Sequence, residues 1–99
     1  MFTSLKPQRV QHDSGYIVQT GGQFSLQYLD GDLIAEIAVD NGPVITGLYP
    51  ESMTLRRAKN APLIAPTLDE QELIMGRIIS ALEFWKMKYE ILKGRPYNT

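Results

Sequence analysis

Few residues of this chain could do chemistry, and the best candidates lie near its N-terminus. His12 is the only histidine and stands beside Asp13 and Ser14, the three residue types of hydrolytic triads. Adjacent residues in a polar segment without periodicity cannot adopt the geometry of a triad, so we interpret His12 as a solvated side chain. The chain has no cysteine, which excludes thiolate nucleophiles, disulfides and thiolate metal ligands together.

The carboxylates give no stronger signal. Asp30 and Asp32 lie in the sequence LDGDL, which lacks the further oxygen ligands and the final glutamate of a calcium loop. Asp32 and Glu36 are four residues apart, a separation of roughly 13 Å along a strand and too long for the carboxylate pair of a hydrolase. We therefore predict no metal site, no cofactor and no catalytic residue, and we favour a binding protein over an enzyme.

The composition limits the remaining classes. A chain of 99 residues, 43% hydrophobic and 21% charged, is typical of one globular domain. Its formal net charge of −1 provides no basic field, so we predict no nucleic-acid binding. The sequence shows no signal-peptide pattern and no apolar run approaching about 18 residues, so we expect a cytoplasmic protein that neither enters a membrane nor is secreted by a signal peptide.

The hydrophobic pattern predicts a single α+β domain over residues 15–99, preceded by a flexible arm over residues 1–14. Short alternating runs are separated by turn signals at Gly21-Gly22, Asp30-Gly31 and Asn41-Gly42, which predict an antiparallel β-meander of four to six strands. Asp30-Gly31 is typical of a two-residue type I′ turn. Pairing about this turn, or pairing shifted by two residues, places one apolar set on a single face of the sheet: Phe24, Leu26, Tyr28, Ala35, Ile37, Val44 and Leu48.

One long helix in the C-terminal half should cover that face. Residues 57–66 read as a connection, and Thr67 with Glu70 forms a capping-box pattern at the start of an apolar stripe. Leu82 and Trp85 on this stripe should be buried. A helix continuing to Lys93 would be about 38 Å long, so we favour a helix that ends near residues 85–86, followed by a last strand over residues 87–92.

The opposite face of the sheet is the better functional lead. The expected pairing sets Ile34 opposite Tyr49 and Ala38 opposite Ile45, an apolar patch with charged residues at its margin, as at protein interfaces. Unless residues 1–14 or 57–66 cover it, we expect this face to bind a protein partner or a second copy of the chain as a homodimer. The predicted binding residues, including a basic residue at the start of the connection, are Ile34, Glu36, Ile45, Tyr49 and Arg56.

The alternative is a domain that binds or converts a small molecule. Its pocket would lie between the sheet and residues 57–66, with Arg56 anchoring an anionic ligand. A closed cavity with convergent polar groups would favour this alternative, whereas a flat apolar patch would favour the protein-binding function.

The order of features also resembles that of small bacterial α+β proteins of mobile gene cassettes and polymorphic-toxin immunity families. The sequences that carry this resemblance are YPESMTLRR, APLIAPTLDEQELIMGRIISALEF and KMKYEIL, within residues 15–92. Tyr49 and Ser52 match a Tyr-x-x-Ser corner of related-looking sequences, whereas the tryptophan and the paired prolines that often follow it are absent here. The resemblance implies a stoichiometric protein binder that neutralises a toxin and has no chemistry of its own.

Overall fold

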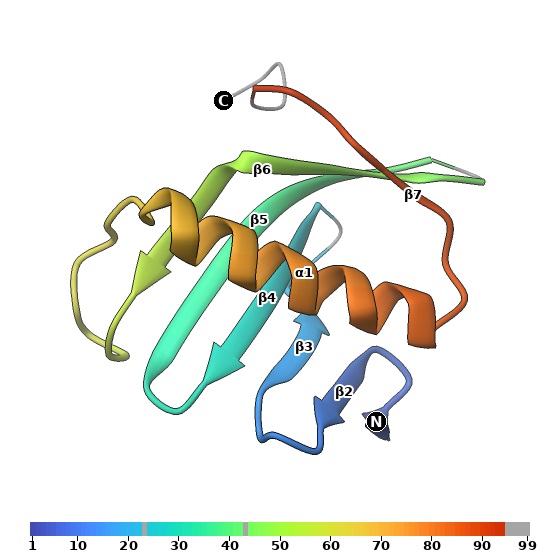
Figure 1. Ribbon diagram of the computed structural model, residues 1–99, viewed down its shortest axis with the longest axis horizontal. Coiled ribbons are helices and arrows are strands. Elements are labelled where there is room, and N and C mark those ends of the chain that lie inside the picture. The colour runs from blue at the N-terminus through green and yellow to red at the C-terminus, as the bar shows by residue number, and fades with distance from the viewer. Residues whose placement is uncertain (23, 43, 95–99) are drawn as a thin grey trace.

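The computed structural model describes residues 1–22, 24–42 and 44–94. In this part of the chain, a seven-stranded sheet with its strands in chain order packs against one helix (Figure 1). The elements are β1 (Phe2–Lys6), β2 (Arg9–His12), β3 (Ile17–Thr20), β4 (Ser25–Asp30), β5 (Leu33–Asn41), β6 (Thr46–Arg56), α1 (Leu68–Phe84) and β7 (Tyr89–Ile91). The mixed α+β class and the helix in the C-terminal half are confirmed, whereas the expected four to six strands are too few.

Strands β1 to β6 form an antiparallel meander, and β7 returns from α1 to pair in parallel with β6. Residues 1–14, expected to be an arm without regular structure, instead supply β1 and β2. Val10 of β2 is fully buried, and Phe2 of β1 packs against the core. These strands carry too few apolar residues to show an alternating pattern in the sequence.

The β4–β5 hairpin differs from its prediction by one loop position. Asp30 pairs with Leu33, so the loop consists of Gly31 and Asp32. Of these two residues only Gly31 has a positive φ, +60°, which is the glycine-first pattern of a type II′ turn rather than type I′. The pairing moves by two residues, and each side chain therefore keeps its predicted face.

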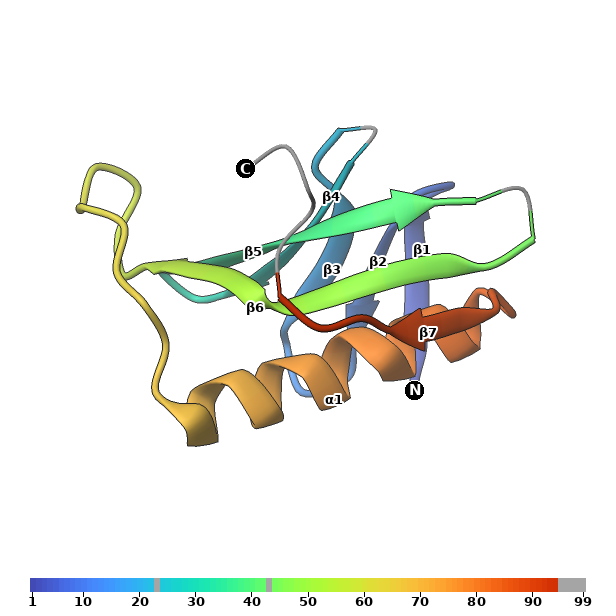
Figure 2. The same cartoon turned by 90° about the horizontal axis from the view of Figure 1, so that it is seen from above.

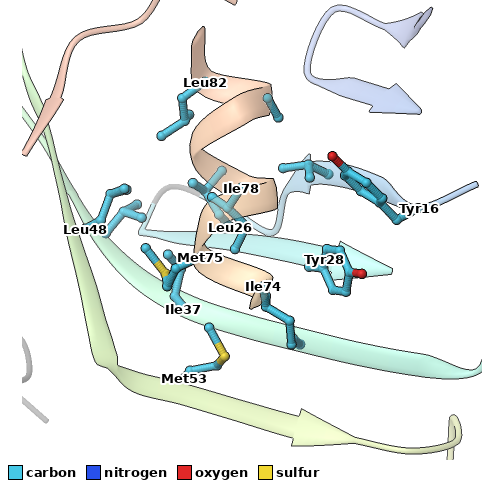
Figure 3. Packing of buried hydrophobic residues seen from close by; sticks show 14 of the residues in the cluster. Tyr16, Leu26, Tyr28, Ile37, Leu48, Met53, Ile74, Met75, Ile78 and Leu82 are labelled. Carbon is cyan, nitrogen blue, oxygen red and sulfur yellow. The ribbon is translucent and has the colours of Figure 1, made fainter. Parts of the chain in front are cut away.

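The core lies between α1 and the face of the sheet turned toward it, which we call the inner face (Figures 2 and 3). Phe24 and Val44 were predicted to be core residues, but they precede β4 and β6 and are 61% and 67% exposed. The other members of the predicted set are buried, namely Leu26, Tyr28, Ala35, Ile37 and Leu48. The helix contributes Ile74, Met75, Ile78, Ala81 and Leu82.

Both ends of α1 are closed by specific hydrogen bonds. At the start, the Thr67 hydroxyl accepts the Glu70 N–H while the Glu70 carboxylate accepts the Thr67 N–H, which confirms the capping box. At the end, Lys86 has φ +60° and its N–H donates to the Glu83 carbonyl, while the N–H of Met87 donates to the Leu82 carbonyl. This pair of bonds is a Schellman motif, and it ends the helix as the shorter alternative predicted.

Trp85, the C-cap residue, is half-buried at the margin of the core rather than buried within it. Beyond it the chain turns back toward the sheet and forms β7, at the place where a last strand was expected.

Strand β6 runs without a break through Tyr49 and Pro50. Ala38 pairs with Tyr49 and Glu36 pairs with Thr54, so residues 50–53 of β6 all stand opposite Ile37. This bulge shifts the register of everything beyond it. Residues 57–66 then follow the edge of the sheet, where Ile64 and Leu55 exchange two backbone hydrogen bonds. Within the described residues, no helix combines the length and apolarity needed to cross a membrane.

Candidate functional site

The candidate site is the face of the sheet turned away from α1, which we call the outer face. Figure 2 shows α1 on one side of the sheet only. The N-terminal segment forms edge strands, and residues 57–66 pair with the edge of β6, so neither lies across this face. Within the described residues, the outer face of β2 to β5 is therefore not covered by another segment of the chain.

A row of polar side chains crosses the middle of the outer face, one from each of five neighbouring strands. Successive cross-strand pairs connect Arg9, Gln19, Gln27, Glu36 and Thr54, a set that we call the polar ladder. Gln19 Nε2 donates to Gln27 Oε1 at 2.8 Å, and Gln27 Nε2 donates to Glu36 Oε2 at 3.1 Å. Neither Arg9 nor Glu36 forms an ion pair with another described residue.

A second row runs beside the polar ladder. Its central residues, Ile17, Leu29 and Ile34, are neighbours across β3, β4 and β5, and we call them the apolar strip. Gln11, opposite Ile17, and Arg56, opposite Ile34, are the next residues at the two ends of this row. All five side chains are half-buried, because neighbouring side chains on the sheet cover part of each one.

Four of the five predicted binding residues lie on the outer face, but not in the predicted arrangement. Ile34 stands opposite Arg56 rather than Tyr49, and Tyr49 stands opposite Ala38. Ile45 precedes β6, is 42% exposed, and has no place opposite Ala38. The bulge and the longer loop of the β5–β6 hairpin cause both differences.

The prediction missed the residues in the middle of the polar ladder. Gln19 and Gln27 alternate with buried residues of β3 and β4, so the same period-two rule that placed Glu36 could have identified them. Arg9 carries no comparable signal, because its strand was not recognised.

Arg56, the anion anchor of the small-molecule alternative, lies at the margin of the sheet. Its guanidinium Nη1 donates to the Lys59 carbonyl at 3.2 Å, which ties the connection to the margin of the sheet. A cavity of about 400 Å³ lies elsewhere, on the inner side beyond the end of α1. Its lining is neutral, with apolar walls and hydroxyl or amide groups, and includes Leu26, Val39, Thr46, Trp85 and Met87.

A cluster of aromatic and charged side chains joins α1 to the β2–β4 part of the inner face. Arg77 Nη1 donates to the Tyr28 hydroxyl at 2.5 Å and lies 3.3 Å from the Asp30 carboxylate, and its guanidinium carbon lies 4.8 Å from the centre of the Tyr16 ring. Burial raises the pKa of both tyrosines above the ordinary value of 10.0. Their hydroxyls therefore stay protonated at neutral pH, and the cluster fastens the helix rather than supplying a base.

The candidate triad is not formed. His12 Nδ1 lies 2.9 Å from Ser14 Oγ and accepts the Ser14 backbone N–H at 3.0 Å. Asp13 pairs with the amino group of Met1 at 3.1 Å and does not orient the histidine. The His12 ring instead stacks on Tyr16, with ring centroids 4.8 Å apart. Among the described residues, no group of His, Cys, Asp and Glu side chains could hold a metal ion.

Comparisons with known proteins add no assignment. No family model matches the sequence, and neither the curated proteins nor the solved structures contain a match. Function is therefore inferred from the geometry of the outer face.

Proposed function

We propose that this chain is a non-enzymatic protein-binding protein that acts through the outer face. The observation that carries the proposal is the pair of rows on β2 to β5, an apolar strip beside a polar ladder. The ladder holds a cation and a carboxylate on separate strands, and neither forms an ion pair with another described residue. Apolar area flanked by polar and charged groups is the usual composition of a protein interface. A stoichiometric inhibitor, as the immunity-like layout implies, needs no more than such a face.

Both edges of the sheet are poorly suited to pairing with a strand of another protein, which supports the outer face as the interface. The register of β1 against β2 shifts between Ser4 and Lys6, and Pro7 follows, so an added strand would meet a bulge, a charge and a missing N–H donor. At the other edge, β7 has only three residues. Short and irregular edges of this kind disfavour strand addition.

Site-specific cross-linking tests the proposal. A photoreactive amino acid at Gln27, in the middle of the polar ladder, should give a protein adduct in cells of the native host. The same probe at Glu72, which is exposed on α1, is the matched control and should give none. Adducts that are equal at both positions, or absent at Gln27 while the protein remains folded, would contradict the proposal.

The neutral cavity favours a second candidate function, the binding of a small uncharged molecule. Trp85 is the only tryptophan and lines this cavity, so its fluorescence reports occupancy directly. Uncharged aromatic fragments should shift the Trp85 emission, and Val39→Phe, which fills the space without adding a second tryptophan, should abolish that response. A library that leaves the emission unchanged at millimolar concentration would remove this candidate.

A further inference from the structure

We infer that the partner of the outer face is a second copy of this chain, paired face to face about a two-fold axis that runs parallel to the strands between β3 and β4. The inference rests on the proposed function, because it names the partner of the same face. It follows from the positions of the two charges in the polar ladder and of the apolar strip beside it.

The polar ladder is self-complementary under this symmetry. A two-fold axis between β3 and β4 places β2 of one copy over β5 of the other, and β3 over β4. Arg9 then faces Glu36 of the second copy, and the second copy's Arg9 faces Glu36, which gives two reciprocal ion pairs. Gln19 faces Gln27 of the second copy between them. The two charges that lack an ion-pair partner within the described chain would thus neutralise each other across the interface.

The apolar strip fits the same arrangement. Because the axis is parallel to the strands, each row lies over the equivalent row, and Ile17 faces Leu29 of the second copy. Facing sheets pack about 10 Å apart, so side chains from both copies fill the layer between them. A shift by one strand to either side would set Arg9 opposite a neutral residue and would lose both ion pairs. The charges therefore specify one register.

The available surface is large enough. The molecule measures 34 × 34 × 23 Å, and the twisted sheet turns its outer face away from α1 (Figure 2). A stable interface buries roughly 800 Å² on each partner, which such a face can supply. An unrelated partner would need a complementary charge pattern of its own, whereas a second copy provides it through symmetry.

Charge reversal with reciprocal rescue tests this register. Sedimentation equilibrium of the parent protein at about 10–100 µM should show a dimer. Arg9→Glu and Glu36→Arg should each weaken dimerisation by about tenfold or more, because each places like charges in contact twice. An equimolar mixture of the two variants should restore a dimer, since every contact in the mixed pair joins opposite charges. Lys88→Glu, an exposed charge reversal in the segment between α1 and β7, is the control and should leave the dimer unchanged.

The outcomes separate this inference from the proposed function. A monomeric parent, or single variants that dimerise like the parent, would overturn the second-copy inference. If the probe at Gln27 still captured a different protein, the outer face would remain a binding face with another partner. Circular dichroism confirms that each variant is folded. If a reversal variant unfolds, Arg9→Gln and Glu36→Gln replace the pair, and dimerisation as strong as that of the parent in both would overturn the inference.

Discussion

The Ser52 hydroxyl accepts a hydrogen bond from the backbone N–H of Ala38 at 2.8 Å and donates one to the Tyr49 carbonyl at 2.6 Å. It replaces the backbone partner that Ala38 loses at the bulge of β6. One side chain thus fixes the register of the outer face on both sides of the bulge.

Ser52→Ala should lower the free energy of unfolding by about 1–2 kcal/mol, because the Ala38 N–H would lose its partner in a half-buried position. Urea denaturation measures this change. Ser80→Ala is the control, since the Ser80 hydroxyl bonds only to the Gly76 carbonyl on the exposed side of α1 and its loss should change stability by less than about 0.5 kcal/mol. Equal effects of the two substitutions would show that Ser52 does not stabilise the bulge.

Tyr28→Phe should destabilise the fold by about 1 kcal/mol, because the Tyr28 hydroxyl accepts from Arg77 and donates to Asp30. The Arg77 and Asp30 side chains are partly solvated and would still pair, which keeps the loss moderate. Tyr89→Phe is the matched control, because the Tyr89 hydroxyl makes no hydrogen bond to the described residues. Thermal unfolding that ranks Tyr89→Phe as the more damaging substitution would contradict the importance of the Arg77 contacts.

Lys86→Gly should stabilise the protein by about 0.5–1 kcal/mol. Lys86 is the only described residue other than glycine with a positive φ, and a side chain in this left-handed region is unfavourable. Glycine removes this cost at the C′ position, although it also gains freedom in the unfolded chain. Lys88→Gly, at a nearby position without positive φ, should destabilise instead. Loss of stability in both variants would refute the assignment of strain to Lys86.

Glu70 should make stability depend on acid pH. The Thr67 backbone N–H, followed by the Arg57 side chain, lowers the pKa of the Glu70 carboxyl below its ordinary value of 4.5. The ionised carboxylate therefore stabilises the folded state above the unfolded pKa, and this contribution is lost as the pH falls through the lower folded pKa.

Glu70→Gln keeps an acceptor for the Thr67 N–H but removes the charge. The stability difference between the parent and Glu70→Gln should shrink as the pH falls from about 6 to about 3. A difference for Glu70→Gln that stays constant over this range would contradict the lowered pKa.

The sequence predicted which side chains face the core better than it predicted their cross-strand partners. Leu26, Tyr28 and Ile37 were correctly assigned, because alternation fixes the face and a shift of two residues preserves it. The partners depend on loop length and on the bulge at Ser52. Ser52 accepts its hydrogen bond from a residue 14 positions earlier in the chain, and no short sequence pattern around Ser52 predicts such a contact.

The N-terminal strands were missed for a related reason. Residues 2–6 and 9–12 offer few apolar side chains, and they become strands because β3 gives β2 a partner and β2 in turn gives one to β1. Arg9 therefore could not be recognised as part of the outer face. The capping box at Thr67 and Glu70 was predictable because its hydrogen bonds join residues only three positions apart.

The outer-face interface is tested most directly by isotope-filtered NMR on a mixture of ¹³C-labelled and unlabelled protein. Intermolecular contacts should appear between the methyl groups of Ile17 and Leu29, and none should appear at Leu73, which is exposed on α1. Contacts confined to α1, or no contacts between copies at concentrations where sedimentation shows a dimer, would contradict an interface on the outer face.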